Sequence, residues 1–438
     1  MNITIIGTGY IGLTEGVCLA DLGHQITCVD IDKQKIQQLQ QGIPTLYEEG
    51  LQEILTRNIQ NKTISFTANL AEALKEAEVI FIAVNTPENK DGTADLSAVF
   101  GVAKQIAKTI TDSKYYVVVT RSTVPVGINR KIKKSIQETN LSLKFDIVSN
   151  PEFSKQGSSI KDFLYPDRII VGVENDSAKK AMSKLYQPIT EKGYPIIFTT
   201  IETAELIKYA SNAFLAAKIG FINEMADLCE KTGGNVIELA QAMGLDKRIG
   251  NKFLNAGPGM GGSCFPKDTV ALVRTGEEYD VDISIIRATV ESNIKRKKAM
   301  AEKIAKILNG VQNKKITLLG LTFKANTDDT RYSPALDIIE GLNQKKAIVN
   351  AYDPQGIPKT KQMLSNEALQ NISFFSNPYE ASQNSECIVV VTEWEEFKKL
   401  DYKKISGLVK DKIIVDLRNI LNEKELQKLG FKYFGIGK

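Results

Sequence analysis

One cysteine stands directly behind a run of glycines in the stretch 257–268, Gly-Pro-Gly-Met-Gly-Gly-Ser-Cys-Phe-Pro-Lys-Asp. Glycine lets a backbone approach a ligand closely, and Cys264 is the reactive side chain on this backbone. Pro266 has the fixed φ of a first helical residue, so Cys264 is expected near a helix N-terminus, where the thiolate is favoured. With Lys267 and Asp268 beside it, the sulfur is predicted to act as a nucleophile. A tight turn with a half-buried cysteine is the alternative, and the crowding of glycines argues against it.

The rest of the composition narrows the chemistry. The chain has one histidine, His24, so a multi-histidine metal site is impossible and acid–base work must fall to Lys, Asp, Glu or water. The cysteines are widely spaced without a C-x-x-C pair, which predicts neither disulfides nor a zinc site, and no metal is expected. Four of them lie in apolar segments and are predicted to be in the core: Cys18, Cys28, Cys229 and Cys387.

The N-terminal segment carries a dinucleotide-binding fingerprint in its full context. An apolar strand, 2–6, leads into Gly7-Thr-Gly9-Tyr-Ile-Gly12, a helical pattern follows, and a second strand, 25–29, ends at Asp30. The glycines allow the turn and the approach to a pyrophosphate at the helix N-terminus. Asp30 can accept from both ribose hydroxyls and would repel a 2′-phosphate, so NAD is expected rather than NADP. Equal efficiency with NADP would contradict that expectation. Lys35 could close over the adenosine side.

Three further apolar runs, 79–84, 116–120 and 145–148, are predicted as buried parallel strands. Polar side chains follow each of them, with Thr86 after the first, Thr123 after the second and Glu152 after the third. Open α/β sheets bind ligands at the carboxyl ends of their strands, so these three ends are predicted to form one rim of a cleft. Each alone would be an ordinary loop.

Residues 202–232 are predicted to form one long helix that ends at Gly233. Lys208 and Asn212 are four residues apart and therefore share one face. A lysine on a helix is usually a solvated charge, but the apolar neighbours of Lys208 indicate partial burial. The length of the helix also favours a connector and a dimer surface.

A second parallel sheet is predicted from the strands 316–319, 347–352, 387–391 and 413–415, without a G-x-G-x-x-G motif. Basic residues lie near its strand ends, which suits an anionic ligand. Salt-bridged surface loops are an equally good interpretation of the same residues. They include Lys324, Arg331 and Arg418.

The predicted fold class is therefore α/β, with two Rossmann-like parallel-sheet domains joined by a long central helix and a helical dimerisation region. We expect boundaries at 1–200, 201–300 and 301–438. A net charge of +4 on 438 residues argues against nucleic-acid or membrane-surface partners. No apolar run approaches the ~20 residues of a transmembrane helix, and no signal segment precedes the first strand. We expect a cytoplasmic protein.

Taken together, these motifs resemble the UDP-glucose/GDP-mannose dehydrogenases, essentially from end to end. The form of the cysteine loop and the segment 248–254 are more similar to the UDP-glucose branch than to the GDP-mannose branch. The motifs that carry the resemblance are Gly7–Gly12, Asn85–Pro87, Ser122–Gly127, Asn150–Phe153, Lys208 with Asn212, 257–268 and Phe323–Arg331.

The resemblance implies oxidation of a sugar CH₂OH group to a carboxylate with two NAD⁺, on a nucleotide-sugar substrate, by a homodimer. It implies that Cys264 is the nucleophile and that Lys208, beside Asn212, stabilises an oxyanion. Glu152, Thr123 and Asp268 would position water and handle protons. The implied NAD site consists of Gly7, Gly9, Tyr10, Ile11, Gly12, Asp30, Lys35, Thr86, Thr123, Lys267 and Arg331. The implied substrate site consists of Glu152, Phe153, Ser154, Lys155, Gln156, Lys208, Asn212, Arg248 from the partner subunit, Phe253, Leu254, Asn255, Ala256, Gly257, Gly261, Lys324 and Arg418.

One position departs from the family pattern. Many members carry a second glutamate four residues after Glu152, and this chain has Gln156 there. An amide cannot act as a base, so either Glu152 carries that work alone or the acid was only a hydrogen-bonding group. The alternatives for function are a dehydrogenase of GDP-mannose or a UDP-hexosamine, and a non-catalytic dinucleotide sensor. The set of Cys264, Lys208 and Asp268 argues against the sensor.

Overall fold

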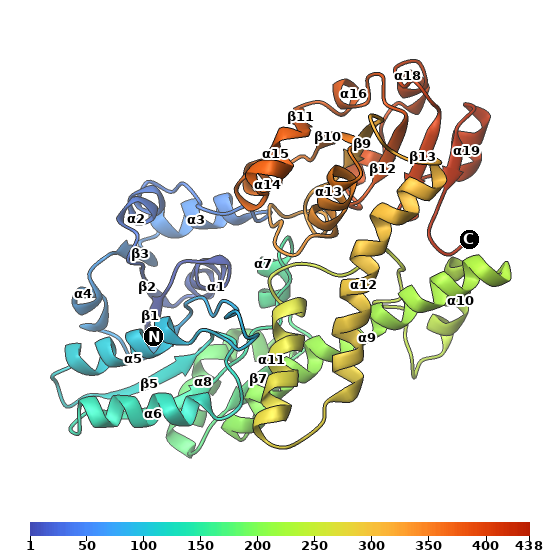
Figure 1. The fold of residues 1–438 in the computed structure, drawn as a ribbon. Coiled ribbons are helices and arrows are strands. Elements are labelled where there is room, and N and C mark those ends of the chain that lie inside the picture. The colour runs from blue at the N-terminus through green and yellow to red at the C-terminus, as the bar shows by residue number, and fades with distance from the viewer. The chain divides into compact units, whose positions relative to one another are not determined.

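The computed structural model describes residues 1–438, and the chain divides into two compact units, Met1–Ser211 and Asn212–Lys438 (Figure 1). Each unit has its own, largely parallel β-sheet. The long helix α9 (Ile201–Thr232) begins in the first unit and ends in the second. None of the helices combines the length and the apolar character that a membrane crossing needs. The α/β class predicted from the sequence, with two parallel sheets and a long helix, is confirmed.

The sheet of the first unit has eight strands in the order β3-β2-β1-β4-β5-β6-β7-β8. Neighbouring strands are parallel except β6 and β7, which meet antiparallel at Ser149 and Gly172. The three strands that end in polar side chains, β4, β5 and β6, are adjacent and parallel, so those ends lie along one edge of the sheet. The strands are β1 (Asn2–Ile6), β2 (Gln25–Val29), β3 (Ile64–Thr67), β4 (Val79–Ile82), β5 (Tyr115–Thr120), β6 (Lys144–Ser149), β7 (Ile169–Gly172) and β8 (Ile196–Thr199).

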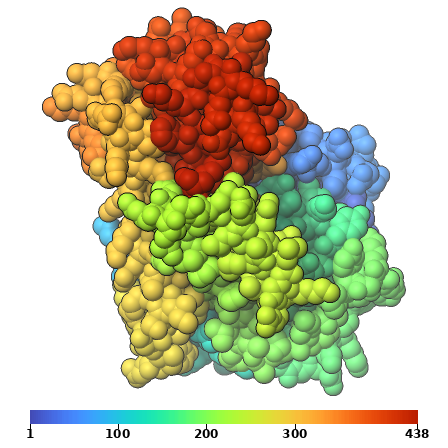
Figure 2. Space-filling model, turned by 90° about the vertical axis from the view of Figure 1, so that its right-hand side faces the viewer, coloured from blue at the N-terminus to red at the C-terminus, as the bar shows by residue number.

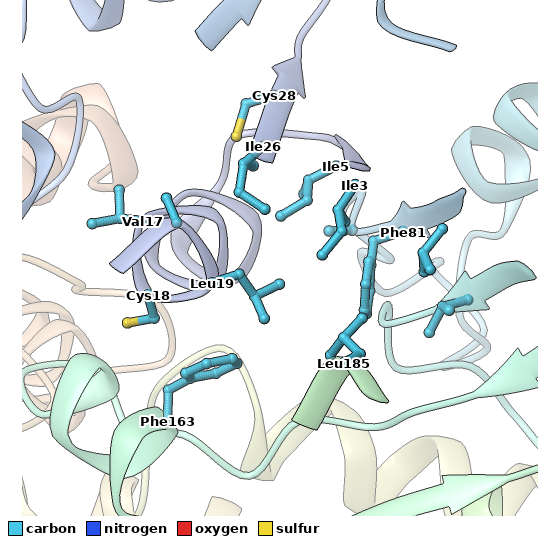
Figure 3. Packing of buried hydrophobic residues seen from close by; sticks show 14 of the residues in the cluster. Ile3, Ile5, Val17, Cys18, Leu19, Ile26, Cys28, Phe81, Phe163 and Leu185 are labelled. Atoms are coloured by element: carbon cyan, nitrogen blue, oxygen red, sulfur yellow. The ribbon is translucent and has the colours of Figure 1, made fainter. Parts of the chain in front are cut away.

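Helices cover both faces of this sheet. They are α1 (Tyr10–Asp21), α2 (Lys33–Gln40), α3 (Leu51–Gln60), α4 (Leu70–Leu74), α5 (Ser97–Thr109), α6 (Ile128–Thr139), α7 (Ser159–Leu164) and α8 (Asp176–Thr190). One apolar core joins Phe81 of β4 to α1, α7 and α8 through Leu19, Phe163 and Leu185 (Figure 3). A second core joins Ile80 of the same strand to α5 and α6. Successive residues of β4 thus enter opposite cores, which explains its continuous apolar sequence.

The second unit has a six-stranded parallel sheet in the order β11-β10-β9-β12-β13-β14. Its strands are β9 (Lys315–Leu319), β10 (Ile348–Tyr352), β11 (Ile372–Phe374), β12 (Cys387–Val390), β13 (Ile413–Asp416) and β14 (Lys432–Phe434). Its helices are α10 (Val236–Leu245), α11 (Phe265–Glu278), α12 (Ser284–Ile307), α13 (Pro334–Gln344), α14 (Ile357–Met363), α15 (Asn366–Gln370), α16 (Pro378–Ala381), α17 (Glu395–Lys398), α18 (Tyr402–Ser406) and α19 (Glu423–Lys428). In Figure 2 the yellow-green α10 lies beside the red C-terminal segment, where the Val236 N–H donates to the Gly437 carbonyl at 2.8 Å.

The two sheets repeat one topology. In each, the first six strands in chain order have the spatial order third, second, first, fourth, fifth, sixth. A glycine of positive φ follows the first strand of each, Gly7 at 103° and Gly320 at 104°. The N–H of Gly7 donates to the carbonyl of Val29, and that of Gly320 to the carbonyl of Tyr352, both at 2.8 Å. The likeness of the two sheets therefore extends to the geometry of the first turn.

We expect Gly7→Ala and Gly320→Ala each to lower the free energy of unfolding by at least about 2 kcal/mol, because both positions have left-handed φ. A Cβ atom on Gly7 would lie 2.6 Å from the Ala83 carbonyl oxygen, and one on Gly320 would lie 2.5 Å from Thr392 Cβ. Gly101→Ala in α5 is the control, since nothing lies within 4 Å of its Cβ, and it should be neutral or gain up to about 1 kcal/mol. Thermal unfolding measures all three. Unchanged melting of either strained variant would contradict the prediction.

Candidate active site

The turn between β1 and α1 has the shape that a pyrophosphate requires. A Cβ atom on Gly12 would lie 1.9 Å from the Gly7 carbonyl oxygen, so helix and turn pack in direct backbone contact. The N-cap of α1 is Gly9, which has no side chain to occupy the positive end of the helix. Tyr10 and Ile11 form the first turn of α1. The residues present therefore fit a dinucleotide, with its phosphates at this helix N-terminus.

Asp30, at the end of β2, is held by the same turn. Its Oδ2 accepts from the Thr8 N–H at 2.9 Å and the Thr8 hydroxyl at 2.6 Å, and its Oδ1 accepts from the Asp32 N–H at 3.1 Å. Lys35 Nζ lies 3.4 Å from Oδ2. Burial opposes ionisation, but these hydrogen bonds and Lys35 hold the pKa of Asp30 below its usual value. Asp30 is therefore an anionic acceptor, which suits ribose hydroxyls.

The ends of β4 and β5 are tied to each other. The Thr86 hydroxyl donates to the Thr123 carbonyl at 3.0 Å, and the Ser122 hydroxyl donates to the Val84 carbonyl at 2.6 Å. These two side-chain bonds fix the loops that follow adjacent strands. Thr86 and Thr123, both predicted for the NAD site, are thus brought together.

A buried ion pair joins the loop after β6 to helix α9. Lys208 Nζ donates to the Glu152 carbonyl at 2.6 Å and to Glu152 Oε1 at 2.8 Å, and both side chains are buried. Glu152 Oε2 accepts from the Ser154 N–H at 2.7 Å. Burial would raise the pKa of Glu152, but Lys208, Arg121 and the hydrogen bonds outweigh it and keep the pKa low. The prediction that Lys208 is partly buried is confirmed, and its burial is nearly complete.

Two cations lie over the aromatic ring of Phe153. The guanidinium of Arg168 is 3.9 Å from the ring centroid, and Lys208 Nζ is 5.4 Å from it. Farther along the same loop, Lys155 turns to Asp162, with Nζ 3.1 Å from Oδ1. The predicted substrate loop 152–156 therefore has both a buried and a solvent-facing portion.

A second buried ion pair supports this loop, and sequence reasoning missed it. Arg121, directly after β5, donates from Nε to Glu15 Oε2 at 2.8 Å. Its Nη1 donates to the carbonyls of Asn150 at 2.9 Å and Pro151 at 3.2 Å. Burial raises the pKa of Glu15, and Arg121 opposes that rise. Three successive carbonyls, 150 to 152, thus face two buried cations. An acid inside the apolar helix α1 was the available signal.

In the second unit, Cys264 is the N-cap residue of α11 and is the one exposed thiol among the five cysteines. Pro266 lies in the first turn of that helix, as predicted. The Ser263 hydroxyl is 3.7 Å from Cys264 Sγ. The prediction that the other four cysteines lie in the core is confirmed.

Asp268, one turn into α11, is buried and accepts from two predicted site residues. Asn212 of α9 donates from Nδ2 to Asp268 Oδ2 at 2.7 Å, and Lys267 donates to Oδ1 at 2.7 Å. Each carboxylate oxygen thus has a side-chain donor. The structure therefore brings Asn212, Lys267 and Asp268 together. Lys267 and Asp268 closely follow Cys264 in the sequence.

The predicted substrate loop 253–257 is packed against its own unit. Leu254 and Ala256 are buried, Asn255 is exposed, and Phe253 adopts a φ of 64° with its ring 6.0 Å from that of Phe265. A Cβ atom on Gly257 would lie 3.2 Å from a terminal nitrogen of Arg418. This loop and Arg418 are therefore neighbours, as a shared substrate site requires.

The basic residues of the second sheet already have protein partners. Arg418 donates to the carbonyls of Val391 at 2.8 Å and Phe323 at 3.0 Å. Arg331 pairs with Asp329 at 2.7 Å, and Lys324 Nζ lies 5.6 Å from the Phe323 ring. The carbonyl of Arg331 accepts from the Gly262 N–H at 2.8 Å, which joins this segment to the cysteine loop.

Two further residues of the second unit, Trp394 and Arg248, differ in their settings. The only tryptophan, Trp394, is buried and donates to Thr322 at 3.1 Å and Asp353 at 3.2 Å, so it belongs to the fold of the second unit. Arg248 is 90% exposed, with its guanidinium 2.6 Å from Asp246, and it joins none of the clusters within its own unit.

The clusters are distributed over the two units. Asp30, Glu152 and Lys208 belong to the first, and Cys264 and Asp268 to the second. Helix α9 carries Lys208 at the end of the first unit and Asn212 at the start of the second, one turn apart.

Family models match nearly the whole chain. The NAD binding domain of the UDP-glucose/GDP-mannose dehydrogenase family matches residues 1–190, the central domain of that family matches 202–295, and its UDP binding domain matches 317–423. A UDP-glucose 6-dehydrogenase of Rhizobium meliloti is 45% identical and covers 100% of both chains. UDP-glucose 6-dehydrogenase TuaD of Bacillus subtilis is 40% identical over 100% of this chain and 93% of its own length.

Solved structures agree with this. A UDP-glucose dehydrogenase of Pyrobaculum islandicum superimposes with a TM-score of 0.91 at 33% identity, covering 99% of this chain and 97% of the other. A UDP-D-ManNAc dehydrogenase of Pyrococcus horikoshii gives 0.86 at 27% identity, over 100% and 99%. A GDP-mannose dehydrogenase of Pseudomonas aeruginosa gives 0.56 at 27%, over 99% of both chains.

We expect Glu152→Gln to lower the free energy of unfolding by about 3 kcal/mol at pH 7, because it leaves the buried Lys208 ammonium without its carboxylate. The folded-state pKa of Glu152 lies below 4.5, so this contribution persists down to that pH and is lost as the pH falls further. Urea unfolding of both proteins between pH 7 and pH 3.5 measures the difference.

The matched control is Glu138→Gln, which removes an exposed carboxylate 3.8 Å from Lys134 and should cost less than about 1 kcal/mol at any pH. If the difference in unfolding free energy between the wild type and Glu152→Gln stays constant as the pH falls into the acidic range, the assignment of the ion pair is contradicted.

Proposed function

Since this chain belongs to the UDP-glucose/GDP-mannose dehydrogenase family, we propose that it oxidises the CH₂OH group of UDP-glucose to the carboxylate of UDP-glucuronate, reducing two NAD⁺ per sugar. Relatives named UDP-glucose 6-dehydrogenase match the whole chain at 40–45% identity, which supports this substrate over other sugar nucleotides. The observation that carries the proposal is Cys264, the one exposed thiol, at the start of α11 behind a glycine loop. A non-catalytic dinucleotide sensor has no use for such a thiol.

The three regions divide the work in this proposal. Residues 1–200 hold NAD at the Gly7–Gly12 turn and Asp30, 201–300 supply the cysteine and the dimer helices, and 301–438 hold the nucleotide of the substrate. Arg418 and Lys324 are basic groups suited to its phosphates. The loops 152–156 and 253–257 would line the sugar.

Bound NAD⁺ would supply the hydride acceptor for both oxidations. The first oxidation gives an aldehyde, to whose carbon the Cys264 thiolate adds, forming a C–S bond and an oxyanion that takes a proton. Loss of a hydride and the hydroxyl proton from that thiohemiacetal leaves a thioester. Water then cleaves the C–S bond, giving the carboxylic acid and the thiol. The covalent adduct keeps the aldehyde from leaving and makes the second step another hydride transfer.

We assign oxyanion stabilisation to Lys208, whose ammonium is already desolvated and therefore acts in a region of low dielectric constant. Loss of one such donor typically costs roughly 10²–10³ in rate. Glu152 is ionised at neutral pH because its pKa is low, so it can accept protons through water. With Gln156 four residues later, Glu152 carries this work alone. Asp268 orients Asn212, and Thr123 completes the water site.

A homodimer is part of the proposal. Phe214, Phe221 and Leu228 on α9 are 67%, 45% and 54% exposed and are seven residues apart, so they form one apolar stripe of the kind that protein interfaces bury. The exposed Arg248 would then reach the substrate of the partner subunit. A cytoplasmic location fits a reaction that needs Cys264 reduced, and cell fractionation tests it.

The wild-type enzyme is expected to release two NADH per UDP-glucose, with no aldehyde trapped by an added amine. GDP-mannose and UDP-hexosamines should give little NADH, and efficient turnover of one of them in place of UDP-glucose would reassign the substrate. Cys264→Ala should lose acid formation yet still bind the nucleotide sugar. Cys264→Ser should stall after the second hydride, because the sugar ester of serine has a poor leaving group. An alanine variant that still forms uronic acid at an appreciable rate would end the covalent mechanism.

For the dimer, we expect Phe221→Lys to sediment as a monomer and to lose activity, since a charge would have to be buried in the apolar stripe. Lys231→Glu changes an exposed charge near the end of the same helix and should remain a dimer with normal activity. Sedimentation velocity reads both. A Phe221→Lys protein that sediments like the wild type would refute the interface.

A further inference from the structure

The backbone of the glycine loop that precedes Cys264 is bonded to side chains of two helices. The Gly257 N–H donates to Asn223 Oδ1 of α9 at 2.8 Å, and Arg296 Nε of α12 donates to the Gly257 carbonyl at 2.7 Å. Both polar groups of this residue thus have a partner from a rigid element.

The same arrangement recurs three residues later. The Met260 N–H donates to Asn293 Oδ1 at 2.8 Å, and Asn293 Nδ2 donates back to the Met260 carbonyl at 3.1 Å. Asn293 and Arg296 are three residues apart on α12 and therefore share one face. Both side chains, and that of Asn223, are buried.

Packing restricts the loop further. A Cβ atom on Gly259 would lie 2.7 Å from Lys297 Cγ, again on α12. On Gly261 it would lie 2.5 Å from the Tyr332 carbonyl oxygen, and on Gly262 it would lie 2.7 Å from the Phe323 ring. The glycines are therefore needed for direct backbone contact with the elements on either side, and the loop is fixed as far as the residue before Ser263.

We propose that Asn293, Arg296 and Asn223 are positioning residues that hold the loop 257–262, and through it the Cys264 sulfur, where the aldehyde forms. This inference rests on the proposed function, in which the thiol must add to the aldehyde before the aldehyde leaves. A free loop with four glycines has high conformational entropy, which the four side-chain bonds to its backbone remove. Misplacement of a reacting atom by about 1 Å can cost 10²-fold in rate.

The ratio of products distinguishes a positioning role from a merely structural one. A less stable protein turns over more slowly in proportion to its folded fraction, but each folded molecule still gives two NADH per sugar. A misplaced thiol instead lets the aldehyde escape, which changes the ratio of products. The ratio does not depend on how much of the protein is folded.

The test uses Asn293→Leu, which removes both bonds to Met260, and Asn293→Asp, which keeps the acceptor for the Met260 N–H and loses the donor. With the leucine variant, NADH per UDP-glucose should fall from two toward one, and an added amine should trap aldehyde amounting to at least about a tenth of the sugar oxidised. The aspartate variant should be intermediate, and it serves alone if the leucine variant does not fold. Ser292→Ala is the control, because the Ser292 hydroxyl donates to Glu224 at 2.8 Å and not to the backbone of the loop.

A second measurement needs no substrate. Cys264 is the one exposed thiol, so the rate of its alkylation by iodoacetamide at pH 7 reports its position at the start of α11. It should fall at least about threefold in the Asn293 variants and stay at the wild-type value in Ser292→Ala. Two NADH per sugar without trapped aldehyde, or an unchanged alkylation rate, would overturn the inference. A wild type that oxidises no nucleotide sugar would refute the proposed function instead, while slower alkylation in the variants would still support the positioning of the thiol.

Discussion

The buried ammonium of Lys208 imposes a strict physical constraint on the first unit. A buried cation without a partner costs several kcal/mol, and Glu152 supplies both its carboxylate and its carbonyl to meet that cost. The loop that carries Glu152 is held by Arg121, which is neutralised by Glu15 on the same helix that begins at the dinucleotide turn. One turn farther along α9, Asn212 meets a second buried acid, Asp268. A single helix therefore fixes a carboxylate in each unit.

The two sheets share a topology but use its first turn differently. Asp30 and Asp353 occupy equivalent positions at the end of the second strand. Asp30 accepts from Thr8, Asp32 and Lys35 and remains partly accessible. Asp353 is buried and accepts from four backbone N–H groups, the Thr322 hydroxyl and the Trp394 indole. Its lone pairs are committed to the fold, so only the first sheet has an acid available for a ribose.

Sequence patterns predicted the parts of the fold that are buried on both faces. The continuous apolar runs of β1, β4, β5, β9 and β12 were recognisable because each contributes to two cores. The four edge strands of the two sheets, β3, β8, β11 and β14, were not predicted. Each has only three or four residues and is partly exposed.

The residues of the candidate site also divide into those that the sequence could predict and those that it could not. The settings of Asp30 after β2, Cys264 at the start of α11 and Lys208 in a buried position could be predicted, because a motif or an unusual context marks each of them in the sequence. Arg121 and Asn293 could not, since a charged or amide residue within a helix or after a strand is ordinarily solvated. Glu15 was missed although its position among the apolar residues of α1 was a signal. Only the pairing of segments far apart in the chain, 106 residues for Glu15 and Arg121, shows that they are buried together.

The distribution of thiols has a chemical consequence of its own. Peroxide can reach one thiol, Cys264, and the four other cysteines are buried, so a sulfenic acid formed there has no resolving cysteine within the chain. Its repair depends on a thiol from outside the chain, and prolonged exposure to oxidant would convert it irreversibly to the sulfinic acid.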